Sequence, residues 1–146
     1  MIIDMQVKIT VRGDKAVLSS LKKKGQGFNN AIKTAVKVSG LQVEKAAKVN
    51  CPVKTGTLRR SISSLDYQKG NEYIARVGPD MNVASYAVYV ETGHSQQPGR
   101  FVPAIGKRLV ASWVEGKWYM AKTAIQMQKK VEDNIKKAFR TALITK

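Results

Sequence analysis

The sequence contains very few of the residues on which metal binding and catalysis usually depend. Cys51 is its only cysteine and His94 its only histidine. A single cysteine cannot form a disulfide within the chain, and these two residues do not make a zinc-ligand set. No phosphate-binding segment of the form G-x-x-x-x-G-K-[ST] occurs. We therefore expect no metal, no cofactor and no enzymatic activity.

Acidic residues are also scarce. The 146 residues include 26 Lys and Arg against 10 Asp and Glu, which gives a formal net charge of +16 and a pI near 10.1. Such a charge favours a polyanionic neighbour, whether nucleic acid, anionic lipid or an acidic protein surface. It carries no information about the fold.

Long hydrophobic runs are absent too, because no apolar stretch approaches the roughly 18 residues that span a bilayer. The first 13 residues alternate apolar and polar side chains and include Asp4, unlike the basic-then-apolar pattern of a secretion signal. We expect a protein made in a reducing cytosol, with no membrane partner. Its length suits one domain, spanning residues 1–146, with one modest core.

Apolar periodicity predicts five regions. Apolar residues at every second position from Ile3 to Val11 predict a strand in 1–13, and Asp14 could cap a short helix that ends at Leu21. A helical apolar face predicts a helix over 29–51, capped by an asparagine at its start and stopped by Pro52.

The three remaining regions are predicted to contain short strands, an irregular segment and a second long helix. Short alternating runs predict strands within 60–91, at 61–67, 73–77 and 86–90. Residues 92–119 form a long irregular segment, of which 109–114 could be half of an extended hairpin. A second amphipathic pattern predicts a helix over 120–144. The predicted class is α+β: a small, mainly antiparallel sheet flanked by two amphipathic helices.

The stretch C-P-V-K-T-G-T-L-R-R-S-I at residues 51–62 lies between the first long helix and the strands. Pro52 can end the helix, Gly56 can adopt positive φ, and the Thr55 hydroxyl can satisfy a freed backbone group. Leu58 can then return to the core while Ile62 begins a strand. The motif can thus be interpreted as a structural connector between helix and strand with no catalytic role. Its basic residues are not needed for the turn.

This stretch and two later blocks resemble a known family. The segment P-V-K-T-G-T-L-R-R-S-I, the segment Y-A-V-Y-V-E-T-G-H at 86–94 and the segment G-K-W-Y-M at 116–120 resemble, in order and spacing, minor structural proteins of long-tailed phages and prophages. These are the head–tail joining proteins, also called neck or tail-completion proteins.

The resemblance implies a virion structural protein of the neck, made in the host cytoplasm. It implies a ring of identical copies, a hexamer, through which DNA is ejected. The implied partners are further copies of the chain, the head-closure or connector protein, the tail terminator or tail-tube protein, and packaged double-stranded DNA in the lumen. The N-terminal strand could extend a sheet between subunits by edge pairing.

Two groups of residues are candidates for these contacts. The basic ones would line a DNA channel or a subunit interface, unless they are only solvated surface: Lys54, Arg59, Arg60, Arg100, Lys107 and Arg108. The aromatic ones would anchor the assembly loop or the core: Phe101, Trp113, Trp118 and Tyr119.

Two other functions compete with the neck role. A sequence-nonspecific double-stranded DNA-binding protein would explain the net charge without any ring. A small toxin or hydrolase would have to use Glu91 and His94, three residues apart at the end of a predicted strand. That pair lacks the helix of the H-E-x-x-H metalloprotease motif, so a structural turn is the preferred interpretation.

Overall fold

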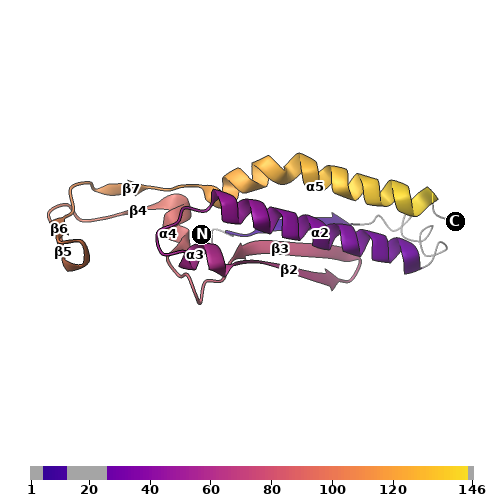
Figure 1. Cartoon of the computed structure of the whole chain (residues 1–146), viewed down its shortest axis with the longest axis horizontal. Coiled ribbons are helices and arrows are strands. Elements are labelled where there is room, and N and C mark those ends of the chain that lie inside the picture. The colour runs from indigo at the N-terminus through magenta and orange to yellow at the C-terminus, as the bar shows by residue number, and fades with distance from the viewer. Residues whose placement is uncertain (1–4, 13–25, 145–146) are drawn as a thin grey trace.

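The computed structural model describes residues 5–12 and 26–144, and shows a helix–sheet body from which a narrow two-stranded arm extends (Figure 1). The helix predicted to begin at Asp14 lies outside the described residues. Among the helices of the described ranges, none combines the length and the apolar character needed to cross a membrane.

The body contains a three-stranded antiparallel sheet in the order β1-β3-β2. Its strands are β1 (Val7–Arg12), β2 (Ile62–Lys69) and β3 (Glu72–Pro79). β2 and β3 form a hairpin whose turn contains Gly70 at φ 58°, and β1 pairs with β3 from Val7 opposite Val77 to Arg12 opposite Glu72. The strands predicted at 61–67 and 73–77 are confirmed.

Two long helices run antiparallel beside the sheet. They are α2 (Gln26–Asn50) and α5 (Tyr119–Ile144). The Asn50 side chain donates to Thr123 Oγ1 over 2.9 Å, while near the opposite ends the rings of Phe28 and Phe139 lie 5.3 Å apart. These two contacts fix the antiparallel orientation, and both predicted amphipathic helices are confirmed.

The hydrophobic core lies between these helices and one face of the sheet. β3 supplies Ala75 and Val77, which have no exposed surface, and α2 packs closely over the sheet at Gly40. A Cβ atom at Gly40 would lie 2.5 Å from Ser64 Oγ and 3.0 Å from Ala75 Cβ, so a side chain there would push the helix away. The other large core residues are Met5, Ile9, Phe28, Ile32, Val36, Val43, Leu58, Ile62, Tyr119, Met120 and Met127.

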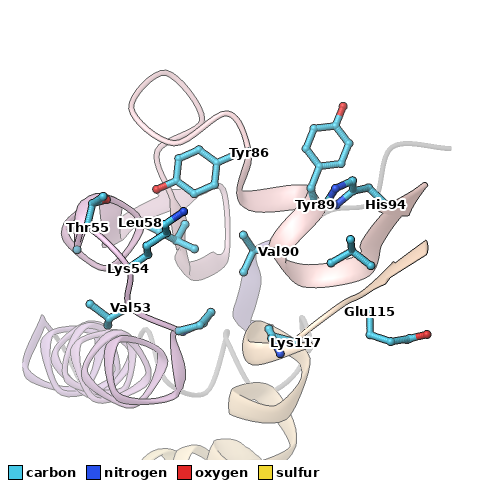
Figure 2. Close-up of a pocket in the computed structure, with 13 residues that line it drawn as sticks. Val53, Lys54, Thr55, Leu58, Tyr86, Tyr89, Val90, His94, Glu115 and Lys117 are labelled. Carbon is cyan, nitrogen blue, oxygen red and sulfur yellow. The ribbon is translucent and has the colours of Figure 1, made fainter. Parts of the chain in front are cut away.

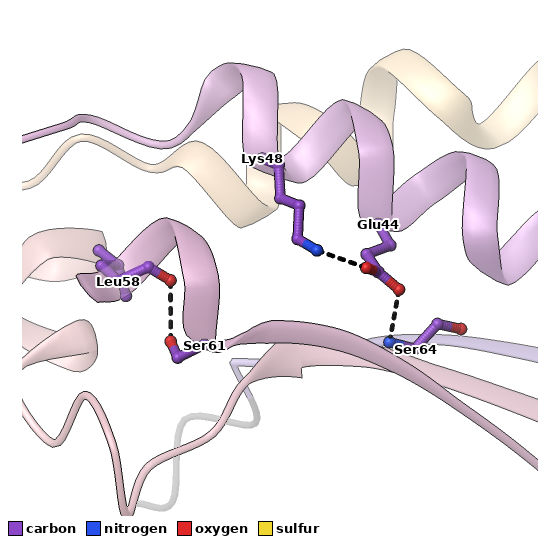
Figure 3. Close-up of polar contacts among 5 residues, drawn as sticks. All are labelled: Glu44, Lys48, Leu58, Ser61 and Ser64. Atoms are coloured by element: carbon purple, nitrogen blue, oxygen red, sulfur yellow. Dashed lines mark hydrogen bonds and ion pairs between the residues drawn. The ribbon is translucent and has the colours of Figure 1, made fainter. Parts of the chain in front are cut away.

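A polar contact also joins α2 to the edge strand β2 (Figure 3). One carboxylate oxygen of Glu44 accepts from the Ser64 amide over 2.9 Å, and the other lies 2.6 Å from Lys48 Nζ. Glu44 therefore satisfies a backbone donor of an edge strand, which would otherwise be open to pairing with another chain.

The strand predicted at 86–90 is wrong: this segment belongs to the short helix α4 (Ala87–Thr92). Ala87 and Glu91, four residues apart, are its buried positions. The Thr92 hydroxyl donates to Val88 O over 3.0 Å within the same turn. A run of five residues is too short to distinguish helical from strand periodicity, and tertiary burial of one helical face decided the outcome.

The arm, defined as residues 93–118, is a long hairpin. At its root β4 (Gly93–Ser95) pairs with β7 (Trp113–Glu115), and nearer its tip β5 (Phe101–Val102) pairs with β6 (Lys107–Arg108). A 3₁₀ turn, η1 (Pro103–Ile105), forms the tip. The expectation of an extended hairpin in 92–119 is therefore met, with its strand at 113–115. The arm extends away from the body (Figure 1).

Candidate assembly interface at the root of the arm

The corner after α2 turns the chain toward the sheet in two steps. The Cys51 amide bonds to Ala47 O over 2.9 Å, which closes the last turn of α2 before Pro52. Gly56 adopts φ 80°, as predicted, and the Thr57 amide donates weakly to Thr55 Oγ1 over 3.4 Å. Leu58 is buried, as expected for a residue returning to the core.

A short helix that the sequence did not indicate, α3 (Thr57–Ser61), completes the corner. The Ser61 hydroxyl donates to Leu58 O over 2.8 Å (Figure 3), and Ile62 then begins β2. Because Leu58 and Ser61 are buried on one side of this helix, Arg59 and Arg60 lie exposed on the other. The corner is thus a structural connector that also displays two cations.

Glu91 joins α4, the arm and α5. Its buried carboxylate accepts from the amides of Met120 and Ala121, each over 3.0 Å, and so satisfies free N–H groups at the start of α5. Its carbonyl accepts from the Trp118 amide over 3.0 Å. Glu91 is therefore a helix cap, a role that its position in the sequence did not reveal.

Two glycines allow the strands at the arm root to approach closely. Gly93 has φ 83°, and a Cβ atom there would meet Val114 O and lie 2.8 Å from Gly116 N. A Cβ atom on Gly116 would meet Glu91 O and lie 2.5 Å from the carbonyl carbon of Thr92. Every one of these neighbours is backbone, which cannot swing aside as a side chain can. The arm root is consequently fixed to α4.

A largely apolar pocket of about 450 Å³ opens beside this root (Figure 2). It is formed where the corner, α4 and the base of the arm meet, which brings the first two sequence blocks and the start of the third to one place. Its lining residues are Pro52, Val53, Lys54, Thr55, Gly56, Leu58, Tyr86, Tyr89, Val90, His94, Val114, Glu115 and Lys117.

His94 lies in this pocket against Tyr89, with the two rings 5.6 Å apart in an edge-to-face arrangement. Its Nδ1 is buried and has no hydrogen-bond partner among the described residues. In the described part of the chain, no three His, Cys, Asp or Glu side chains gather where they could hold a metal ion. The pocket can therefore offer a largely apolar surface to an occupant.

Beneath the corner, two ionisable groups are buried. Burial raises the pKa of the Cys51 thiol, and the nearby Arg59 only partly opposes this effect. Burial is also the main cause of the strongly raised pKa of Tyr119, with smaller contributions from the neighbouring Cys51, Glu91 and Tyr86. Both groups stay neutral in the folded protein near neutral pH, and Cys51 is an inert core residue.

The six predicted basic residues fall into two separate clusters. Lys54, Arg59 and Arg60 belong to the corner at the arm root, with Lys54 at the pocket (Figure 2). The others belong to the far part of the arm: Arg100, Lys107 and Arg108. The single subunit does not bring the two clusters together. All six are exposed, and none takes part in the ion pairs found among the described residues.

The aromatic candidates also divide. Phe101, Trp113 and Trp118 lie on the arm and are about half exposed. Tyr119 lies in the core with no exposed surface, so its designation as an assembly-loop anchor is corrected: it anchors α5 to the body. The sequence contained one signal for this difference, because Tyr119 precedes the long amphipathic pattern of α5 directly.

A comparison with protein families finds a match over much of the body. A family model described as "HK97-gp10_like: Bacteriophage HK97-gp10, putative tail-component" matches residues 15–93, more than half of the chain. The match contains α2, the corner, the β2–β3 hairpin and α4, and ends at the first residue of the arm. No curated protein and no solved structure matches the chain.

The chain thus belongs to the HK97 gp10-like family of phage tail components. This membership confirms the resemblance to phage head–tail joining proteins and gives the chain a structural role in the virion tail. A family of this kind is typically non-enzymatic. The strand β1, the arm beyond Gly93 and the helix α5 lie outside the matched range.

Proposed function

We propose that this protein forms a ring in the phage neck, joins the capsid connector to the tail tube and lets DNA pass through its centre. The main support for this proposal is the exposed apolar surface of the arm. Apart from a few half-buried positions, residues 96–118 are exposed, although they include apolar side chains such as Phe101, Ile105, Val110 and Trp113. An isolated two-stranded hairpin is marginally stable in water, and exposed apolar surface of this kind marks a protein contact.

The rigid root of the arm supports the same role. Lys117 and Trp118 donate to Val90 O and Glu91 O over 2.8 and 3.0 Å, so the arm leaves the body in a defined direction. A projecting element with a fixed direction can join one subunit to the next at a constant angle. Repetition of such a contact closes a ring when the rotation permits it.

The net charge suits a lumen that contains DNA. In a ring of six or more copies, the excess of cations on every copy would surround one axis. Contacts between cations and phosphates are independent of base sequence and weaken with salt, so DNA could pass without being held at particular bases. The described residues leave the two basic clusters on the surface, where an assembled ring could use either of them.

The proposal is tested by the solution mass of the purified protein, by electron microscopy of the particles, and by titration with duplex DNA at low and moderate salt. We expect rings, formed alone or beside a head-closure or tail-tube protein. Tight DNA binding by a monomer or dimer that never forms rings would overturn the proposal and favour the nonspecific DNA-binding alternative.

The pair Glu91 and His94 gives little support to an enzyme. The Glu91 carboxylate is already engaged by two backbone amides at the start of α5, so its replacement would disturb that helix whatever its chemistry. Only a substitution of His94 can test catalysis. A hydrolase that uses His94 would lose its activity in a His94→Gln variant, whereas the neck role predicts no hydrolytic activity for the substitution to remove.

A further inference from the structure

We propose that the arm tip of one copy inserts into the pocket at the arm root of the next copy. Phe101 and Ile105 are the inserted side chains. This proposal rests on the ring proposed above and names the contact that would build it. It makes each pocket a site that is complete only when a second copy of the chain is present.

The tip is a preformed apolar projection. Phe101 and Ile105 lie at the two ends of the segment that contains η1 and are 50% and 53% exposed. The Arg108 guanidinium donates to Gly99 O over 2.7 Å, and the Gly99 and Leu109 amides form backbone bonds of 2.8 and 2.9 Å across the hairpin. A tip held in this way loses little conformational freedom when it binds, which favours affinity.

The pocket is complementary in size and in chemistry. Its volume of about 450 Å³ is in the range of small binding pockets, and apolar side chains dominate its walls. Tyr86 and Tyr89 lie beside it with 41% and 58% of their surface exposed, and the rings are drawn at its edge in Figure 2. Such rings attract cations, and Arg100 directly precedes Phe101 at the tip.

Charge does not favour this contact overall. Glu115, the one acidic residue in the sequence from 93 to 118, lines the pocket, while Arg100, Lys107 and Arg108 lie toward the tip. Lys54 and Lys117 line the pocket as well, so its lining is net positive and weakly repels a basic tip. The apolar side chains must therefore supply most of the binding free energy.

The occupant has to come from another copy. Tip and pocket lie at opposite ends of the same arm, which extends away from the body (Figure 1). Folding the tip back onto its own pocket would require a sharp bend in the arm between the β4–β7 and β5–β6 pairings. Each copy thus offers one projecting apolar tip and one distant apolar pocket. This is a head-to-tail arrangement, which generates a ring or an open filament.

Disulfide trapping tests the contact directly. An Ile105→Cys variant is mixed with a Val53→Cys variant, and in parallel with an Ile125→Cys variant as a matched control. Val53 lines the pocket and is 52% exposed, whereas Ile125 lies on α5 and is 77% exposed. The natural Cys51 is buried and can remain. We expect the mixed disulfide with Val53→Cys to form at least tenfold faster than the control. Equal rates would overturn the proposal.

Removal of the tip side chains gives an independent test. A Phe101→Ser, Ile105→Ser double variant should weaken self-association at least tenfold in sedimentation experiments. A Val110→Ser variant should not, because Val110 is 90% exposed on the same arm but away from the tip. If the double variant forms normal rings, arm docking is wrong although the neck role survives. If Ile105→Cys forms its disulfide with a head or tail protein and not with Val53→Cys, docking between copies is likewise wrong and the neck role is retained.

Discussion

The side chain of Tyr119 has two opposing effects on the stability of the fold. Its ring is fully buried and anchors the start of α5, yet its hydroxyl has no hydrogen-bond partner among the described residues. A buried hydroxyl without a partner costs about 1–3 kcal/mol relative to one that is satisfied. The ring therefore stabilises the fold while the hydroxyl reduces that benefit.

This predicts a pH-dependent difference for Tyr119→Phe. Because burial raises the pKa of Tyr119 in the folded state, the tyrosine contributes stability that is complete below its unfolded pKa near 10 and is lost as pH rises above it. The loss is about 1.4 kcal/mol per pH unit. Phenylalanine cannot ionise. The variant should equal or exceed the parent in stability at pH 7 and gain a further advantage at pH 11.

Urea denaturation at both pH values measures the two free energies of unfolding. Tyr89→Phe is the matched control, since it removes the same hydroxyl group from a ring that is 58% exposed and lies outside the core. A clear loss of stability in Tyr119→Phe at pH 7 would mean that the hydroxyl is satisfied after all. A pH-independent difference would contradict the raised pKa.

At the scale of elements, the arm depends on its root more than on its own strands. Its pairings are short, and most of its side chains are exposed. The Lys117 and Trp118 amides bond to α4, and Trp118 adopts φ 53°, an uncommon conformation for a residue other than glycine. Such local strain persists only where the surroundings over-determine it, here through α4 and the start of α5.

The substitution Gly116→Ala should therefore release the arm. The added Cβ atom would meet the backbone of Glu91, Thr92 and Gly93, which we expect to cost about 1–3 kcal/mol locally, as overpacking does elsewhere. Hydrogen exchange of the Lys117 and Trp118 amides should accelerate roughly tenfold or more, while α2 keeps its protection.

Gly27→Ala is the matched control for this experiment, because among the described residues nothing outside its own stretch of α2 lies within 4 Å of the added Cβ atom. It should leave exchange at the arm root unchanged. If Gly116→Ala also leaves the exchange of Lys117 and Trp118 unchanged, the close approach of the two backbones does not hold the arm in place.

At the scale of the whole molecule, charge and apolar contacts oppose each other. A chain with a net charge of +16 repels its copies, whereas the exposed arm and the pocket favour contact between them. Added salt shortens the Debye length from about 14 Å near 0.05 M to about 6 Å near 0.3 M, so it screens the repulsion and leaves the apolar contact in place.

We therefore expect self-association to strengthen between about 0.05 and 0.3 M NaCl, as measured by sedimentation velocity. Affinity for duplex DNA in the same buffers should fall, since phosphate contacts release counterions. Self-association that disappears at the higher salt would show that ion pairs hold the copies together, contrary to the apolar contact argued above.

The sequence could predict the elements whose periodicity is long. The apolar faces of α2 and α5 repeat over many turns, and β2, β3 and the turn at Gly70 follow ordinary alternation. The positive φ of Gly56 and the burial of Leu58 also followed from local chemistry, because proline and glycine restrict or free the backbone wherever they occur. These features depend on neighbours in the chain.

Other features depended on neighbours in space, and only the tertiary structure decided them. The segment 86–90 became a helix because one of its faces is buried against the body, and Glu91 became a cap because α5 begins beside it, 28 residues later. The same is true of the pocket, which needs the corner, α4 and the arm together. Local sequence patterns carry no information about such contacts between distant segments, because these contacts result from how the core packs.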